Sequence, residues 1–235
     1  MSSRGDPKPP VWARPEPRGR GQRQPLSRAQ IVKVAVSIAD LEGLEAVSIR
    51  RLARELRSGA MSLYHYFDTR DELLEMMGDA VAGEMLVPSL PSEWRPALEA
   101  VARASRATFL AHPWLLPALQ GVPAVTPNLL RHIEQSAQAI MPLAGRVDPA
   151  QLNAIVTAVD DYTVGFTLRE LASGGSDERS RRFAARFADP NVRYLLESGE
   201  FPLLSQFVAG GADAPPPDFE RGLKFLLDGF EAQIS

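Results

Sequence analysis

The side chains best suited to binding chemistry lie together in residues 48–70, which read SIRRLARELRSGAMSLYHYFDTR. Ile49, Leu52 and Leu56 recur at helical spacing, so they mark the inner face of a helix whose other faces carry arginines. A run poor in helix formers follows, and a second short helix can begin near Ala60 with hydroxyl and aromatic groups outside. A helix, a tight turn and a second helix of this kind are typical of proteins that read the DNA major groove.

The chain offers little catalytic or metal-binding chemistry. Asp160 and Asp161 are adjacent on a predicted helix, but no third carboxylate follows at the spacing of an aspartate-rich metal site. None of the three histidines, at positions 65, 112 and 132, is spaced to form a metal pair on one helix. Cysteine, a glycine-rich phosphate loop and a nucleophile elbow are all absent. We therefore expect no enzyme activity, no metal and no cofactor.

The charge is distributed unevenly along the chain. Residues 1–70 hold 13 Lys and Arg against 7 Asp and Glu, whereas the remaining 165 residues hold 13 against 22. The basic part contains the predicted helix pair, and a basic surface attracts a phosphate backbone whatever its sequence. A charge bias alone could equally mark a solvated surface. DNA binding is favoured because the basic residues lie in the same segment as the predicted helix pair.

Residues 27–75 resemble the DNA-binding domain of the TetR family of bacterial repressors, in particular its tetracycline-repressor branch. The blocks S-I-R-R-L-A-R-E-L and S-L-Y-H-Y-F-D-T-R-D-E-L-L carry the resemblance. It implies an all-α chain with an N-terminal three-helix DNA-binding domain and a larger helical domain. One departure is Arg57-Ser58, which stands where the family has Gly-Val. Either Arg57 adopts the left-handed conformation, at a cost of about 1 kcal/mol, or Gly59 carries the bend.

The resemblance also assigns DNA-binding roles, position by position. The residues concerned are Arg50, Ala60, Met61, Ser62, Tyr64, Tyr66 and Arg70. Ser62 and Tyr64 are expected to face the groove, and Tyr66 and Arg70 to touch the DNA backbone. Arg50 could reach a base or a phosphate, and the two apolar members can offer only contacts such as one with a thymine methyl group.

Composition and helix signals divide the chain into three regions. Residues 1–26, rich in Pro, Arg and Gly and without periodicity, are expected to form a disordered basic arm. Arg14, Arg18, Arg20 and Arg23 in this arm could reach phosphates or a minor groove, or the arm could be an inert leader. Residues 27–73 form the predicted DNA-binding domain, and residues 74–235 the effector-binding and dimerisation domain.

Caps and prolines predict where the helices begin. Capping-box spacings at Ser27 and Thr69 open the first helix and the helix after the reading pair. Further helices are expected over residues 94–110, 114–119, 127–141, 149–172 and 219–232, with a shorter segment near residue 194. No alternating run of β-branched residues predicts a strand.

Helices 149–172 and 219–232 are apolar on more than one face, so they need either full burial or a partner chain. The resemblance implies that these two helices pair with their symmetry mates in a four-helix bundle. Such a homodimer would place two reading helices on a palindromic double-stranded DNA operator. Burial within one monomer is the alternative.

The resemblance further implies a pocket for a small-molecule effector in the larger domain. The side chains that could line it are His112, Trp114, His132, Asp160, Asp161, Tyr162, Phe166 and Arg169. Each also has a structural interpretation: His112 as a helix cap, Trp114 as core, and Asp161 with Arg169 as an ion pair.

We therefore expect a ligand-responsive transcriptional regulator, by default a repressor that its effector releases from DNA. The alternative is a helical protein-interaction adaptor with a degenerate DNA-binding head. A cytoplasmic location fits the lack of cysteine, of a signal segment and of an apolar run of 18 residues or more.

Overall fold

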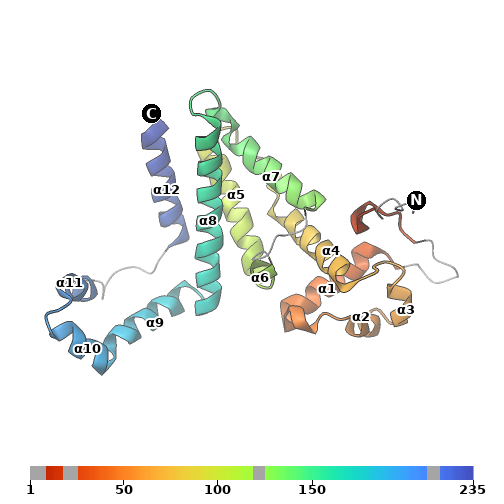
Figure 1. Cartoon of the computed structure of the whole chain (residues 1–235), viewed down its shortest axis with the longest axis horizontal. Coiled ribbons are helices and arrows are strands. Elements are labelled where there is room, and N and C mark those ends of the chain that lie inside the picture. The colour runs from red at the N-terminus through yellow and green to blue at the C-terminus, as the bar shows by residue number, and fades with distance from the viewer. Residues whose placement is uncertain (1–8, 18–25, 119–124, 211–217, 235) are drawn as a thin grey trace, which may run out of the picture.

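The structure, a computed structural model, describes residues 9–17, 26–118, 125–210 and 218–234. The described residues form helices and no strand, as the sequence predicts (Figure 1). The α-helices are α1 Arg28–Glu42, α2 Ile49–Glu55, α3 Ala60–Leu63, α4 Arg70–Ala82, α5 Trp94–Ala111, α6 Leu115–Ala118, α7 Pro127–Ile140, α8 Pro149–Ser173, α9 Ser176–Ala188, α10 Pro190–Glu197, α11 Pro202–Gly210 and α12 Phe219–Ile234. Short 3₁₀ helices occupy η1 Val11–Ala13, η2 Leu44–Ala46, η3 Gly83–Met85 and η4 Met141–Leu143.

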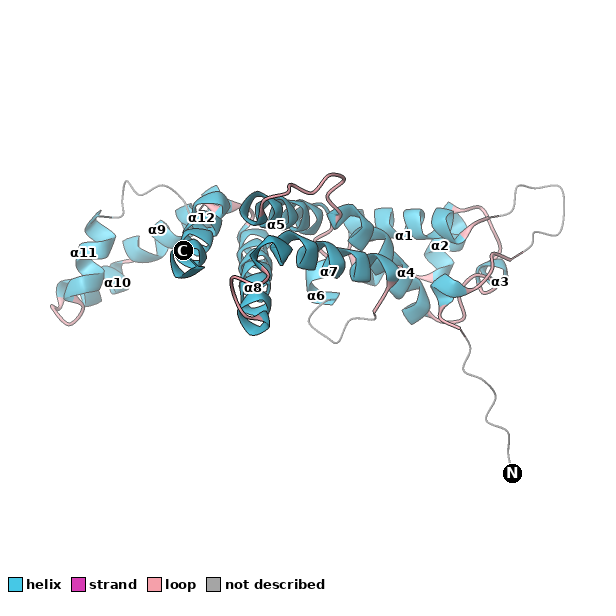
Figure 2. Ribbon diagram, turned by 90° about the horizontal axis from the view of Figure 1, so that it is seen from above, coloured by secondary structure: helices cyan, strands magenta, loops and turns pink. Residues whose placement is uncertain are grey.

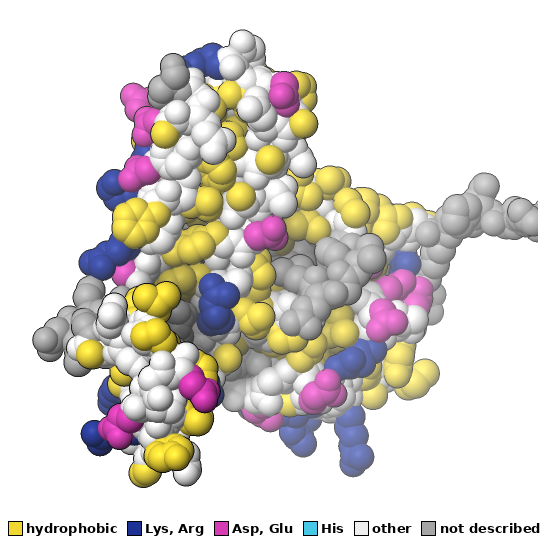
Figure 3. Space-filling view, turned by 60° about the vertical axis from the view of Figure 1, so that its left-hand side comes forward, with side chains coloured by type: hydrophobic (Ala, Val, Ile, Leu, Met, Phe, Trp, Pro, Cys, Tyr) yellow, Lys and Arg dark blue, Asp and Glu magenta, His cyan; other side chains and the backbone are white. Residues whose placement is uncertain are grey.

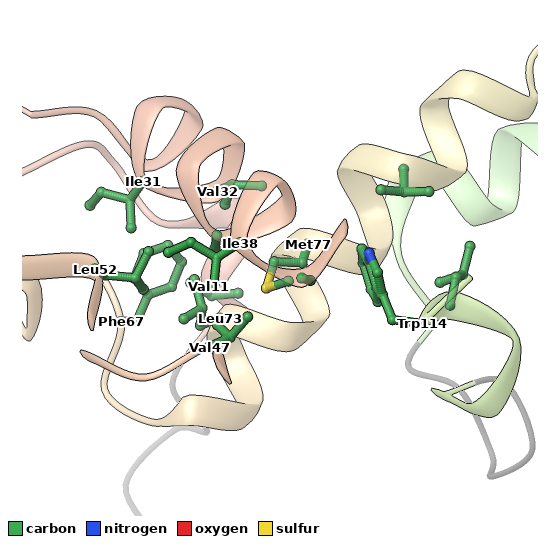
Figure 4. Packing of buried hydrophobic residues seen from close by; sticks show 14 of the residues in the cluster. Val11, Ile31, Val32, Ile38, Val47, Leu52, Phe67, Leu73, Met77 and Trp114 are labelled. Carbon is green, nitrogen blue, oxygen red and sulfur yellow. The ribbon is translucent and has the colours of Figure 1, made fainter. Parts of the chain in front are cut away.

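Helices α1 to α4 form a small head with its own core. The hydroxyl of Ser27 accepts a hydrogen bond from the Gln30 amide, and Thr69 does the same for Glu72, so both predicted helix starts are confirmed. Leu52 and Phe67 are at most 1% exposed and pack with residues of α1 and α4 (Figure 4). This core fixes the angle between α2 and α3.

The turn between α2 and α3 is built on Arg57 rather than on Gly59. Arg57 has φ 51°, in the left-handed region, whereas Gly59 has φ −76°. The Ser58 amide donates to the Ala53 carbonyl at 2.9 Å and the Arg57 amide to Arg54 at 3.3 Å. These two bonds are those of a Schellman motif, which usually has glycine at the left-handed position.

Residues 9–17 differ from the disordered arm that composition predicts. Val11 is 1% exposed within the core of the head, and the Trp12 indole donates to Glu75 on α4. Arg14 pairs with Glu72 at 2.6 Å and with Asp68 at 3.0 Å instead of remaining free for phosphates. Residues 9–17 are ordered by tertiary contacts, and these cannot be recognised from the sequence pattern of the segment alone. The other three arginines expected to reach DNA lie outside the described residues.

The larger domain is built on α5, α7, α8 and α12, which enclose a second core (Figure 1). The predicted ends of these helices agree with the structure to within two residues, because Pro, Asp and Gly mark them. Helices α9 and α11 were not predicted. Together with α10 they extend from the end of α8, at the opposite end of the molecule from α3 (Figure 2).

Helix α5 belongs to both cores. Ala97, Leu98 and Val101 pack in the second core, whereas Phe109 packs in the first. The expected domain boundary after residue 73 falls inside α4, whose Met77 also belongs to the first core. Helices α4 and α5 therefore connect the head to the larger domain. No helix in the described ranges is both long and apolar enough to span a membrane.

Candidate DNA interface and effector region

Helix α3 presents a small set of side chains outward. Leu63 is completely buried and anchors the helix, whereas Met61 is 75% exposed and Tyr64 47% exposed. Ala60 and Ser62 are exposed as well. The predicted groove-facing residues are therefore accessible, and α3 lies at one end of the molecule (Figure 2).

Three other predicted DNA contacts lie beside α3. Arg50 is exposed on α2. Arg70 is exposed, and its guanidinium donates to the Leu44 carbonyl at 3.3 Å, so it also supports the segment before α2. Tyr66 is only 7% exposed, and its hydroxyl donates to the Leu26 carbonyl at 2.7 Å. Burial raises the pKa of Tyr66, and in this arrangement the hydroxyl supports the fold.

One accessible residue beside this surface was not predicted. His65 follows Tyr64 directly and is exposed. The position of His65 directly after the reading helix could have indicated a DNA contact, since polar side chains there can reach phosphates.

His112 and Trp114 lie at the junction of the two domains and not within the second core. His112 Nδ1 is 2.7 Å from Asp40 Oδ1, and Trp114 Nε1 donates to the same oxygen at 2.7 Å. His112 Nε2 is 3.1 Å from Glu84 Oε2. The two residues connect the end of α5 to α1 and η3, and their carboxylate partners were not singled out in the sequence.

His132 and Asp160 form a polar pair between α7 and α8. His132 is 8% exposed, and its buried Nδ1 has no hydrogen-bond partner among the described residues. Asp160, on α8, is exposed. Burial lowers the pKa of His132 and raises the pKa of Asp160. An unpaired buried nitrogen beside an accessible carboxyl is the kind of polar pair that orients a ligand.

Tyr162 and Phe166 join α8 to α12. The rings of Tyr162 and Phe219 stack with centroids 5.4 Å apart, and the Tyr162 hydroxyl donates to the Phe219 carbonyl at 2.9 Å. The Arg106 guanidinium lies 5.0 Å from the centroid of Phe219 and also pairs with Glu170 at 2.8 Å. These two predicted effector contacts therefore hold the last helix in place.

The remaining predicted effector residues, Asp161 and Arg169, are exposed on α8. They do not form the expected ion pair within the part of the chain that the structure describes. Their side chains thus do not share the enclosed setting of His132.

A helix-turn-helix head joined to a larger helical domain that buries an unpaired histidine nitrogen defines a ligand-responsive DNA-binding regulator. The family model "Tetracyclin repressor-like, C-terminal domain" matches residues 87–234, and "Bacterial regulatory proteins, tetR family" matches residues 31–77. The chain therefore belongs to the TetR family of bacterial transcriptional regulators.

Individual relatives agree with this assignment. The HTH-type transcriptional repressor DrrR1 of Streptomyces coeruleorubidus is 35% identical over 96% of this chain and 84% of its own length. ActR of Streptomyces coelicolor, solved in complex with actinorhodin, is 29% identical with a TM-score of 0.71, covering 90% of this chain and 98% of ActR. BioQ, solved with its natural double-stranded DNA operator, is 26% identical with a TM-score of 0.51, covering 74% of this chain and 97% of BioQ.

Proposed function

We propose that this protein is a transcriptional repressor that binds a palindromic operator as a homodimer and leaves it when a small-molecule effector binds. The observation that carries the proposal is the exposed surface of α3, with Met61, Ser62 and Tyr64 held outward by the buried Leu63. The name of DrrR1 supports repression, and the operator complex of BioQ supports DNA as the target. Binding of chromosomal DNA would place the protein in the cytoplasm, and the function requires no catalytic step.

The proposed dimer forms through α8 and α12. Phe225 on α12 is 67% exposed and Leu168 on α8 is 39% exposed, although both helices also contribute apolar side chains to the second core. Figure 3 shows hydrophobic side chains along the upper part of the molecule, where Figure 1 places these helices. Large apolar groups left outside one monomer are typical of a surface that a second copy covers.

For the effector, we propose that His132 and Asp160 supply the polar contacts. The buried Nδ1 of His132 lacks a partner, which a ligand hydroxyl or carbonyl could provide according to the tautomer. The complex of ActR with actinorhodin supports a small-molecule ligand for this fold. Asp161 and Arg169 remain proposed as contacts at the exposed rim of α8.

The proposal is tested by fluorescence anisotropy with labelled duplex from the DNA that flanks the protein's own gene. An unrelated duplex of equal length is the control, and both are measured at two salt concentrations. Tight, sequence-preferring binding that weakens with salt is expected, because bound Lys and Arg release counterions from DNA. Weak binding that is equal on both duplexes, by a folded dimer, would favour the adaptor function instead.

A further inference from the structure

His112 is one of the residues that bond the larger domain to the head, beside Trp114 and Asn128. It follows the last residue of α5, and its side chain is only 9% exposed. Asp40, at 2.7 Å, stands near the end of α1, and Glu84, at 3.1 Å, stands in η3 directly after α4. Trp114 strengthens the joint by donating to the same Asp40 oxygen.

The hydrogen bonds of His112 require its imidazole ring to be positively charged. Ionised carboxylates only accept hydrogen bonds, so both ring nitrogens of His112 must donate to satisfy Asp40 and Glu84. Only the imidazolium ion has two N–H groups. A neutral ring would point the lone pair of one nitrogen at a carboxylate oxygen, and one of the two bonds would be lost.

Within the described residues, the other charged groups near this joint have partners elsewhere or are exposed. A groove of about 790 Å³ between α1 and α4 is lined by His112 and its two carboxylates. Its remaining charged lining residues are Arg14, Glu16, Arg28, Lys33 and Asp79. Asp79 accepts from the Asn128 amide at 2.7 Å, and Arg14 pairs with Glu72. The bonds to His112 within the described ranges thus come from Asp40 and Glu84.

We propose that protonated His112 is a latch that fixes the head to α5, and that loss of its proton loosens the head and weakens operator binding. The inference rests on the proposed function for its effect on DNA. A head held at one position loses little freedom on binding, whereas a loosened head must be ordered by the DNA at a cost in affinity.

The direction of the pH effect follows from the environment of the ring. Burial by itself would lower the pKa of His112, but the bonds to the two carboxylates outweigh it and raise that pKa above its usual value. The latch therefore stabilises the joint fully at pH values below the unfolded-state pKa of about 6.5. This stabilisation is lost as the pH rises through the higher folded-state pKa.

The first test follows the ring itself by NMR in the full-length protein with ¹⁵N-labelled histidine. The chain has three histidines, so loss of one set of signals in His112→Gln assigns the latch. We expect both nitrogens of His112 to carry protons to a higher pH than in a free histidine. Glu84→Gln should shift that titration to lower pH, whereas Glu45→Gln, an exposed charge on η2, should leave it unchanged. A measured pKa of His112 equal to or lower than that of free histidine would overturn the proposal.

The second test measures operator affinity by anisotropy between pH 6.5 and 8.5 at constant salt. Wild type should lose roughly fivefold or more in affinity across this range. His112→Gln, which keeps one possible bond to Asp40, should lose clearly less affinity than wild type across this range, and Glu45→Gln should follow wild type; His65, which lies beside the reading surface, is present in all three proteins. Equal pH profiles for wild type and His112→Gln would refute the latch.

Failure of the proposed function itself would look different. If no duplex is bound specifically at any pH, the latch is judged by hydrogen exchange in α1, corrected for the intrinsic exchange rate. Protection in α1 that falls with pH in wild type but not in His112→Gln supports it. Protection that is equal in the two proteins at every pH contradicts it.

Discussion

Arg57 ends α2 in a backbone conformation that favours glycine. Its φ of 51° makes it the one residue other than glycine with positive φ in the described part of the chain. The left-handed conformation costs about 1–2 kcal/mol for a residue with a Cβ, and the Schellman bonds of the turn maintain it.

Arg57→Gly should therefore raise the free energy of unfolding. The gain is expected to be about 0.5–1 kcal/mol, because relief of strain exceeds the extra entropy that glycine brings to the unfolded chain. Arg57→Ala, which removes the charge but keeps the Cβ, is the matched control and should show little gain. Urea unfolding of the three proteins makes the comparison, and a less stable Arg57→Gly would show that the turn does not carry this strain.

Tyr64→Ala should weaken operator binding while leaving the fold intact. Tyr64 is 47% exposed on the reading surface, so its ring and hydroxyl are available to DNA and little core packing is lost. A loss on the order of tenfold or more is expected in a gel-shift titration. Tyr194→Ala, the same change at a 75% exposed residue of α10, should bind like wild type. Unchanged binding by Tyr64→Ala would remove this residue from the interface.

Which side chains of α3 are exposed could be predicted from the sequence. The long-range hydrogen-bond partners of other site residues could not. Met61 and Tyr64 are exposed as expected, whereas Tyr66 turns inward to the Leu26 carbonyl. His112 and Trp114 were predicted as effector contacts but bond to Asp40, which lies more than 70 positions earlier. Such long-range pairs depend on how helices pack, and spacing along the chain does not encode that packing.

At the scale of elements, the contact between α8 and α12 depends on a glycine. A Cβ placed at Gly222 would lie 2.1 Å from the Tyr162 hydroxyl oxygen, so the ring approaches the α12 backbone closely. The same hydroxyl donates to the Phe219 carbonyl, one turn earlier on α12. The last helix is therefore positioned by a fit that tolerates no side chain at this point.

Gly222→Ala should destabilise the protein by about 1–3 kcal/mol, because the Tyr162 ring must move and lose its hydrogen bond. Gly78→Ala on α4 is the matched control, since a Cβ there meets no atom within 4 Å. That control should instead stabilise by about 0.5–1 kcal/mol through helix propensity. Thermal unfolding distinguishes the two, and equal effects would mean that the Tyr162 contact does not matter.

Helix ends were the most predictable feature at this scale, because local chemistry sets them. Asp148 and Gln151 form the capping box before α8, and Gly174 ends it in the left-handed conformation. The ordered segment around Val11 and Arg14 was not predictable, since its order comes from the surface of α4. Helix α11 begins at Pro202, a start signal of the same kind, but it was not predicted. Among the side chains that the structure describes, α9 and α11 contribute none to either core.

At the scale of the whole molecule, the head and the proposed dimer surface lie on different parts of an elongated chain (Figure 2). Helices α4 and α5 connect them, and His112 bonds the end of α5 to the head. A change of position in the larger domain can therefore reach α3 through packed helices. This is the physical requirement for an effector to alter the spacing of two heads.

Phe225→Glu should convert the proposed dimer to a monomer. Phe225 is 67% exposed on α12, so the substitution removes no core contact within one subunit but would bury a charge between two. Leu41→Glu, at an 83% exposed position at the end of α1, is the control and should leave the dimer intact. Sedimentation velocity gives the masses. A dimeric Phe225→Glu protein would move the interface away from this part of α12.

In the proposed complex, two copies of α3 read two half-sites of the operator together. This arrangement is tested by comparing binding to an intact operator duplex and to one with a single half-site scrambled. Each mismatched base pair typically costs about 1–3 kcal/mol, so a scrambled half-site should lower affinity by roughly a hundredfold or more. Equal affinity for the two duplexes would show instead that one head alone carries recognition.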